Sequence, residues 1–222
     1  MKHPLDLRID PIPELEFFPE PHAYRFQGQW IPYSVTTVTK GSKGTYFTDT
    51  LALPDDDPQR IRLEEALDRG STIHDALERW NRGEPVPEHP FSDWTAPCIG
   101  DPFWNRWKPV PGGVELSLID PRYRIAGRCD VIVQNQETGE LAMADYKTQA
   151  HRDSKPYNIR AQLGAYCNLA DQHPNTRKLT FTKCFAIWIR PGNTVFQPIE
   201  ATECITEYLA ARDLFFRSLP DF

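Results

Sequence analysis

The chain has 222 residues, 40% of them hydrophobic and 12% aromatic, and this length favours a single domain with one substantial core. Its longest apolar runs are shorter than the ~18 residues that a membrane-spanning helix requires, so we expect no membrane segment. The formal net charge of −6 argues against binding a long duplex through a broad basic field, although an enzyme that releases its polymer needs only a local basic groove.

The cysteines and the N-terminus indicate the compartment. Five cysteines form an odd number without a C-x-x-C pair, which favours free thiols over disulfides or a zinc ribbon. The first residues, Met1–Asp6, contain no apolar segment of the kind that directs secretion. We therefore expect a cytoplasmic protein that stays in the compartment where it is made.

The N-terminal region is expected to be extended. Residues 22–38 resemble a short hairpin that turns at Gly28 and continues as an extended segment, Ser34–Val38. The segment Lys40–Gly44, with two glycines and a serine, is typical of a mobile loop. Its lysines would either contact phosphates or simply be solvated.

The first long helix is predicted from Pro58 to Trp80. Asp57 can cap its N-terminus, and proline suits the first helical position. Seven residues recur at helical spacing and define its inward face: Leu63, Ala66, Leu67, Gly70, Ile73, His74 and Leu77. For His74 the alternative to a functional role is a core histidine that hydrogen-bonds a backbone carbonyl.

A segment rich in proline and tryptophan follows, from residue 81 to residue 112. Its tryptophans would suit stacking on bases, but packing is the more common role for such residues, which are Trp94, Trp104 and Trp107. We expect this segment and residues 1–57 to form the walls of a substrate channel.

The rest of the chain alternates strands and helices. The predicted elements are strands at Gly113–Leu118, Tyr123–Gln134 and Leu141–Thr148, a helix at Tyr157–Ala170, strands at Leu179–Ile189 and Thr194–Ile199, and a helix at Thr202–Leu219 capped by Thr202. This order is typical of a mixed α/β sandwich. The single domain then divides into an N-terminal hairpin and loop (1–57), a histidine-bearing helix (58–80), a Pro/Trp-rich insertion (81–112), a sheet with its helix (113–200) and a C-terminal helix (201–222).

The predicted hairpin between residues 123 and 148 brings acids together. If its turn is centred on the Glu137-Thr138 pair, Asp130 lies opposite Asp145, whereas a bulge at Gly139 would shift the pairing by one residue. Directly opposed residues have Cβ atoms about 4.5–5.5 Å apart, so two carboxylates there can share one metal ion. Surface acids beside a turn are the alternative, but the apolar flanks indicate buried strands, where unpaired acids are costly.

Lys147 lies two residues beyond Asp145 and therefore on the same face of its strand. An ammonium group beside two acids and a metal can orient a water molecule and assist its deprotonation. The alternative is a structural ion pair with Asp145 or Glu115, which would use the same residues.

The pattern Asp130, then Asp145-x-Lys147, resembles the PD-(D/E)XK nuclease superfamily. Four other segments resemble motifs of its RecB-like, CRISPR-associated and mitochondrial genome-maintenance exonuclease branch, in the family's order: Ser34–Val38, the histidine-bearing segment Arg69–Glu78, the acidic strand Val114–Leu116 and the Q-x-x-x-Y helix Gln162–Tyr166. The resemblance implies a restriction-endonuclease-like α/β core, with a mixed central sheet flanked by helices.

The resemblance also implies roles for individual residues. His74, Asp130 and Asp145 would ligate Mg²⁺ or Mn²⁺, with the carbonyl of Tyr146 as another ligand, and Lys147 would activate water. Three further residues would assist: Glu115 as an additional acidic ligand or as the partner of a water at the metal, and Gln162 and Tyr166 as supports of the lysine and the substrate phosphate. Gln162 and Tyr166 could instead simply share a helix surface.

The chemistry of these ligands bears on the metal. Mg²⁺ prefers oxygen ligands, whereas an imidazole ligand favours Mn²⁺, so we expect strong activity with Mn²⁺. Some members of this branch hold an iron–sulfur cluster. The wide spacing of the cysteines here, at 98, 129, 167, 184 and 204, argues against one.

By resemblance the protein is a DNA exonuclease acting on single-stranded or free ends in a bacterial or phage-infected cell, with a possible partner protein in recombination, repair or CRISPR adaptation. Two alternatives stay open. One is a non-catalytic nucleic-acid-binding or assembly subunit that retains the fold, and the other is a structure-selective or sequence-selective endonuclease. Polarity, oligomeric state and activity on RNA do not follow from the sequence.

Overall fold

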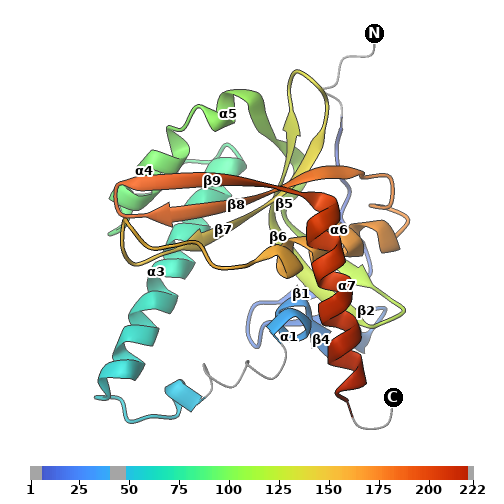
Figure 1. Ribbon diagram of the computed structural model, residues 1–222, viewed down its shortest axis with the longest axis horizontal. Helices are drawn as coiled ribbons and strands as arrows, with labels where there is room; N and C mark the ends of the chain where they lie inside the picture. Colours follow the sequence, from blue (N-terminus) through green and yellow to red (C-terminus); the bar gives the residue numbers. More distant parts are fainter. Residues whose placement is uncertain (1–6, 41–48, 220–222) are drawn as a thin grey trace.

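The computed structural model describes residues 7–40 and 49–219, and its centre is a six-stranded mixed sheet (Figure 1). β6 pairs along one edge with antiparallel β5. Its other edge is shared, because parallel β4 pairs with the first residues of β6 and antiparallel β7 pairs with later ones. β8 and β9 continue the sheet beyond β7. The strands are β4 (Tyr33–Ser34), β5 (Trp107–Asp120), β6 (Ile125–Asn135), β7 (Leu141–Thr148), β8 (Phe181–Arg190) and β9 (Asn193–Glu200).

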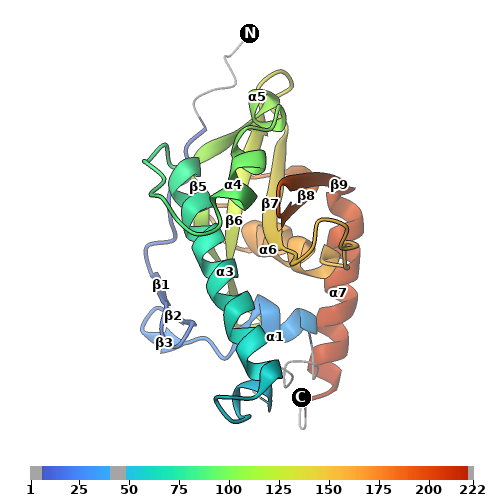
Figure 2. The same ribbon diagram turned by 90° about the vertical axis from the view of Figure 1, so that its left-hand side faces the viewer.

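Helices cover both faces of this sheet, which confirms the predicted α/β class (Figure 2). The described helices are α1 (Val35–Lys40), α3 (Pro58–Asn81), α4 (Ser92–Ile99), α5 (Phe103–Arg106), α6 (Arg160–Gln172) and α7 (Ala201–Arg217). Ile73 and Leu77 of α3 pack in a core cluster with Tyr146 of β7. Leu163 of α6 and Tyr208 of α7 belong to the cluster on the opposite face. None of the helices in the described parts of the chain has the length and apolar character needed to span a membrane.

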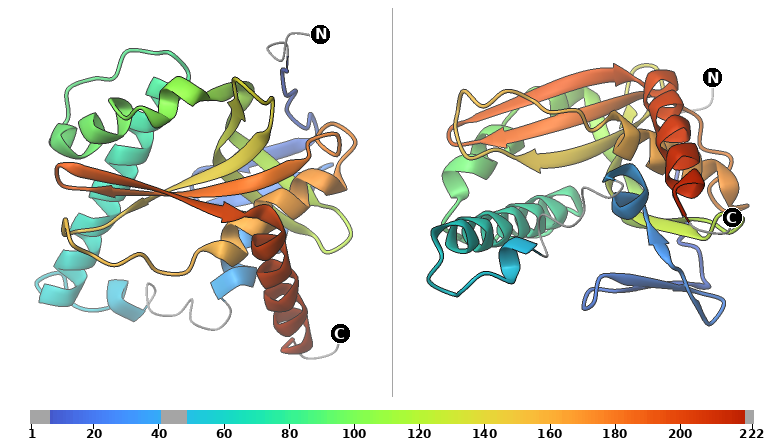
Figure 3. Two further views of the ribbon diagram at one scale, coloured as in Figure 1. Left: turned by 45° about the horizontal axis from the view of Figure 1, so that its top comes forward. Right: turned by 60° about the horizontal axis from the view of Figure 1, so that its bottom comes forward.

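The N-terminal region forms a separate three-stranded sheet (Figure 3). β2 (Ala23–Phe26) and β3 (Gln29–Trp30) make the predicted hairpin, whose turn places both Gln27 and Gly28 at positive φ. β1 (Leu15–Phe18) pairs with β2 and lies in a proline-rich stretch for which no strand was predicted.

The expectation of an extended segment at Ser34–Val38 was wrong beyond its first residue. Only Ser34 belongs to a strand, and α1 begins at Val35. The side chain of Ser34 accepts a hydrogen bond of 3.0 Å from the backbone N–H of Thr37, as a helix N-cap does. Val35 and Val38 are buried on one side of this turn, so packing outweighs the low helix propensity of β-branched residues. Residues 41–44 of the predicted mobile loop lie outside the described residues.

α3 begins where it was predicted, with Asp57 accepting a 2.7 Å hydrogen bond from the backbone N–H of Gln59. Its inward face is shorter than the pattern suggested. Leu63, Ile73 and Leu77 are buried, but Leu67 is 46% exposed. The N-terminal half of α3 projects beyond the sheet (Figure 1).

Residues 81–112 contain α4, α5 and the start of β5, rather than loop alone. Trp94, Trp104 and Trp107 are buried in the core cluster beneath α3, which supports packing over base stacking. No residue of the segment 81–112 lines the acidic pocket described below, and its expected place in a wall of a substrate channel stays a prediction.

The other boundaries shift by a few residues. α6 begins at Arg160 rather than Tyr157, which leaves Tyr157 in the preceding loop. α7 begins at Ala201, and the expected cap at Thr202 is wrong because Thr202 lies within the helix and Glu200 occupies the N-cap position, without a capping hydrogen bond from its side chain.

Candidate active site

Three carboxylates stand side by side on three neighbouring strands. On β5 and β6, Glu115 and Asp130 face each other between two paired positions, Val114 with Val131 and Leu116 with Cys129. On the other edge of β6, Val131 pairs with Ala144, and one further step in the same register brings Asp130 opposite Asp145. Gly139 has a positive φ in the turn without shifting this register, so the paired positions have the predicted register, and they end one step before Asp130 and Asp145.

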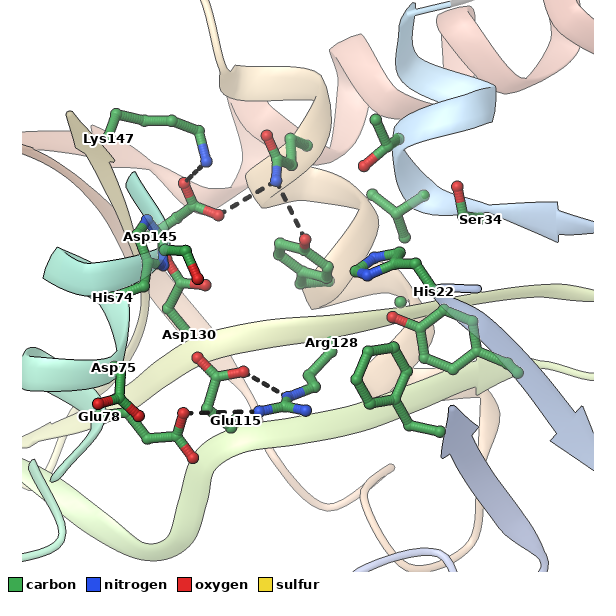
Figure 4. Close-up of a pocket in the computed structure, with 18 residues that line it drawn as sticks. His22, Ser34, His74, Asp75, Glu78, Glu115, Arg128, Asp130, Asp145 and Lys147 are labelled. Carbon is green, nitrogen blue, oxygen red and sulfur yellow. Dashed lines mark hydrogen bonds and ion pairs between the residues drawn. The ribbon is translucent and has the colours of Figure 1, made fainter. Parts of the chain in front are cut away.

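The sheet opens at this point. β7 leaves β6 after the Val131–Ala144 pair, and β4 pairs only with Ile125 and Ala126, so residues 127–130 of β6 lie in a fork between the two strands. Asp130 fills part of the gap, because its carboxylate accepts a 2.6 Å hydrogen bond from the backbone N–H of Tyr146. The fork is the floor of a pocket of about 450 Å³ (Figure 4).

Glu115 reaches the pocket through an unusual backbone conformation. Its φ of 52° lies in the left-handed region that non-glycine residues rarely adopt. The strand alternation breaks there, since Val114 packs in the cluster beneath α3 and Leu116 in the cluster on the opposite face. Backbone strain of this kind costs of order 1–3 kcal/mol and is found most often at functional sites.

α3 supplies the fourth group. His74 has 32% of its side chain exposed and its Nδ1 lies 3.7 Å from Asp130 Oδ2, so it faces the pocket and is not a core histidine. One ligand atom from each of His74, Glu115 and Asp130 lies within 4.8 Å of the others. Within residues 7–40 and 49–219, no other group of three or more potential ligands of this kind is found.

Burial and the neighbouring carboxylate of Asp130 raise the pKa of Glu115 to about 8, although Arg128 opposes the shift. The same causes raise the pKa of Asp145 to about 6 against the charge of Lys147. Without a cation, the site therefore holds more negative charge than its surroundings accommodate. This electrostatic mismatch is what a bound cation would relieve.

Lys147 and Asp145 form an ion pair at the edge of the pocket, and Asp145 is almost fully buried. Burial alone would lower the pKa of Lys147, but the carboxylates of Asp145 and Asp130 raise it overall. Lys147 Nζ also donates to the carbonyl oxygen of Tyr146 at 3.3 Å. Asp145 and the Tyr146 carbonyl, both expected ligands, therefore contact the lysine, and Asp145 does not belong to the three-residue group.

α6 holds this ion pair in place. Gln162 Nε2 donates to Asp145 Oδ1 at 3.2 Å and to the Tyr166 hydroxyl at 3.1 Å. Gly127 on β6 permits the close approach, because a Cβ there would lie 2.5 Å from Val35 and 3.0 Å from the ring of Tyr166. The Q-x-x-x-Y pair thus contacts the acidic centre and is more than a shared helix surface.

Three charged residues of the pocket were not predicted from the sequence, and these are Asp75, Glu78 and Arg128. Arg128 forms an ion pair with Glu115 and lies 3.6 Å from Glu78 (Figure 4), and the carboxylate of Glu78 also pairs with Arg82. Two of them could have been found by spacing, since Arg128 is two residues before Asp130 on β6 and Glu78 is four residues after His74 on α3.

The N-terminal sheet contributes an aromatic wall that was also missed. Phe17 of β1, Tyr24 of β2 and His22 in the turn between these strands line the pocket, and the ring centre of Phe17 lies 5.1 Å from those of the other two. The guanidinium of Arg128 stands over Phe17 at 4.8 Å from its ring centre. No local pattern in the sequence places this sheet beside β6, so only the three-dimensional structure reveals the wall.

The five cysteines are buried and free. The sulfur atoms of Cys167 and Cys184 lie 3.5 Å apart, away from the residues that line the acidic pocket. That the chain holds no iron–sulfur cluster stays a prediction.

Acidic groups that gather at a fork in a mixed sheet, with a lysine two residues past the last of them, could hold a divalent cation and orient a water molecule for phosphodiester hydrolysis. A family model described as the PD-(D/E)XK nuclease superfamily matches residues 95–203. The chain belongs to this superfamily, whose members are nucleases that use divalent metals and act on nucleic acids.

Two further comparisons add little. No curated protein matches the chain. Among solved structures, one described as "Crystal structure of SSO0001" is 16% identical and covers 82% of this chain and 75% of that chain, with a TM-score of 0.41. A similarity of this size does not indicate a function.

Proposed function

We propose that the protein is a divalent-metal-dependent DNA exonuclease that prefers single-stranded ends. The observation that carries the proposal is the alignment of Glu115, Asp130 and Asp145 on three neighbouring strands, with Lys147 on the same side of β7 as the last of them. A purely structural ion pair would need only one acid beside the lysine. Three buried or half-buried acids fit a site that binds a cation.

The donor set suits a divalent cation. His74, Glu115 and Asp130 would hold it, with Asp145 and the Tyr146 carbonyl as further ligands implied by the family pattern. Carboxylate oxygens suit Mg²⁺, and the imidazole makes Mn²⁺ the better fit. When bound, such a cation neutralises the scissile phosphate and lowers the pKa of a coordinated water.

The protein's own groups supply the rest of the chemistry. Lys147 orients the attacking water and places its positive charge beside the phosphate, because Asp145 and Gln162 fix its position. The hydroxyl group of Tyr166 accepts a hydrogen bond from Gln162 and so helps to hold that side chain in place. The positive charge of Arg128 partly neutralises the carboxylates of Glu115 and Glu78, which reduces their repulsion of the substrate phosphate.

The preference for single-stranded DNA is supported by the aromatic wall. Phe17, His22 and Tyr24 border the same pocket as the acids, so a base can stack there while its phosphate lies over β6. A paired base inside a duplex offers no free face to such a wall. Single-stranded termini therefore fit the pocket better than an intact duplex.

A digestion assay on end-labelled linear and on circular single-stranded DNA tests the proposal. We expect the wild type to shorten linear DNA with Mn²⁺ or Mg²⁺, to leave circles intact, and to stop when the metal is chelated. Asp130→Asn should abolish this activity, whereas Asp171→Asn, at an exposed position of α6, should not. Cut circles would indicate an endonuclease, and absence of cleavage by the wild type would indicate a non-catalytic subunit.

A further inference from the structure

We propose that a second hollow, next to the acidic pocket, binds the single DNA strand on the far side of the scissile phosphate. This inference rests on the proposed function and extends it to a second subsite. The hollow has a volume of about 690 Å³ and lies between α1, the loop before α6 and α6 itself. It adjoins the acidic pocket directly, because Thr36, Lys147 and Gln162 line both.

The hollow has the charge that a phosphate requires. Lys40, exposed at the end of α1, and Lys147 of β7 border it from two sides. Burial, followed by the charge of Lys147, lowers the pKa of Lys40, and the carboxylate of Asp145 opposes the shift. An anion in the hollow would lie between two ammonium groups and be attracted by both. The hydroxyl groups of Thr36 and Thr39 also line the hollow and add hydrogen-bond donors.

The same hollow presents one aromatic face. Tyr157 is 55% exposed, and its ring is fixed edge-on against the buried ring of Trp188 at 5.0 Å. A rigid aromatic ring at the surface is a stacking platform for an unpaired base. Tyr157 lies in the loop that leads into α6, between the acidic centre and the outer edge of the sheet.

The path continues beyond Tyr157. A smaller hollow of about 280 Å³ is lined by Tyr157, Asn158 and Ile159 as well, so it adjoins the second hollow on its outer side. Acidic pocket, lysine-lined hollow and outer hollow therefore follow one another. A single strand fits this succession, because its phosphates can meet the lysines while an unpaired base stacks on Tyr157. A duplex keeps its bases paired and could use only the lysines.

Binding measurements can separate the two contacts. Fluorescence anisotropy of an end-labelled thymidine oligonucleotide would be recorded over a range of salt concentrations, with Asp130→Asn as the background that prevents cleavage. Lys40→Ala should weaken binding and reduce the slope of log affinity against log salt by about 0.7, the amount expected for one lost phosphate contact on a single strand. Lys178→Ala, at another exposed lysine, should leave the slope as it is.

The aromatic contact should behave differently. Tyr157→Ala is expected to weaken binding by about five- to a hundredfold, the cost of losing one stacked base, without changing the salt slope. Tyr157→Phe keeps the ring and should bind like the background protein. A blunt duplex of the same length should bind more weakly and be insensitive to Tyr157→Ala.

Two outcomes separate this inference from the proposed function. Unchanged affinity and salt slope in both Lys40→Ala and Tyr157→Ala, in a protein whose wild type degrades linear DNA, would overturn the second subsite and leave the nuclease proposal intact. Oligonucleotide binding that depends on Lys40 and Tyr157, in a protein that cleaves nothing, would support the subsite and contradict the nuclease proposal.

Discussion

Gln162 links the hydrogen bonds of α6 to the acids of β7. Its amide group donates to both Asp145 and Tyr166, so the orientation of the Asp145 carboxylate, and through it that of Lys147, depends on this side chain. Groups that orient ligands or catalytic residues are typically worth ten- to a hundredfold in metal affinity or activity. Gln162 is thus a positioning residue rather than one that reacts.

We therefore expect Gln162→Met to lower kcat by about ten- to a hundredfold, with a much smaller effect on KM, because substrate contacts stay while Lys147 loses its fixed position. Gln172→Met makes the same change at the exposed end of α6 and serves as the matched control. Steady-state rates on labelled DNA measure both. Equal rates for Gln162→Met and the wild type would show that the hydrogen bonds only stabilise the helix.

The pair Asp130 and Asp145 could be predicted from the sequence because a short turn fixes the register of a hairpin. The position of Glu115 could not, because it depends on a left-handed backbone conformation that reverses which face of β5 its neighbours occupy. Local patterns report spacing along one strand. They do not report a break in the alternation, nor which distant segment supplies Phe17 and His22.

At the scale of elements, the contact between α6 and α7 depends on Gly164. A Cβ built on this residue would lie 1.9 Å from the backbone carbonyl oxygen of Cys204, a distance that no relaxation of a side chain can relieve. The two helices cover the sheet together, and α6 carries Gln162 and Tyr166. This glycine therefore sets the distance between the two helices.

Gly164→Ala should lower the free energy of unfolding by about 1–3 kcal/mol or more, as overpacked cores do. Helix propensity alone predicts the opposite sign, a gain of about 1 kcal/mol. Gly70→Ala in α3 is the matched control, because its Cβ would lie 3.7 Å from Thr148 and meet no clash. Chemical denaturation of both variants measures the difference, and stabilisation of both would refute the close packing of α6 on α7.

Helices and strands with a clear hydrophobic periodicity were predicted well, and short elements were not. β7 matches its predicted bounds, and α3 agrees within one residue, because alternation and capping define them locally. α1 was missed because its Val-Thr-Thr-Val sequence has strand propensity, and the helix forms only because Val35 and Val38 pack against other parts of the fold. α4 was missed because proline-rich segments resemble loops, although Pro97 lies within this helix.

For the whole molecule, the acidic site makes the stability of the metal-free fold depend on pH. The carboxyl group of Glu115 has an ordinary pKa of 4.5 and a pKa of about 8 in the folded chain, because burial and Asp130 disfavour its charge. In the window between pH 4.5 and about 8, the folded state therefore keeps a proton on Glu115 that the unfolded chain has released. Stability is largest below the ordinary value, falls as pH rises through the window, and levels off above it. Asp145, with its pKa raised to about 6, acts in the same direction at lower pH.

A divalent cation should reverse this trend, because it binds the ionised carboxylates of the folded state and not the unfolded chain. We expect Mn²⁺ to raise the melting temperature most near the upper end of the window, about pH 8, and least near 4.5, where Glu115 and Asp145 hold their protons. Glu115→Gln should flatten the pH dependence of the metal-free protein and reduce the gain from Mn²⁺. Glu88→Gln, which removes an exposed carboxylate, should do neither. Thermal unfolding at both ends of the window measures these effects. A gain from Mn²⁺ that is equal at both pH values, or unchanged in Glu115→Gln, would place the cation away from the fork of β6 and β7.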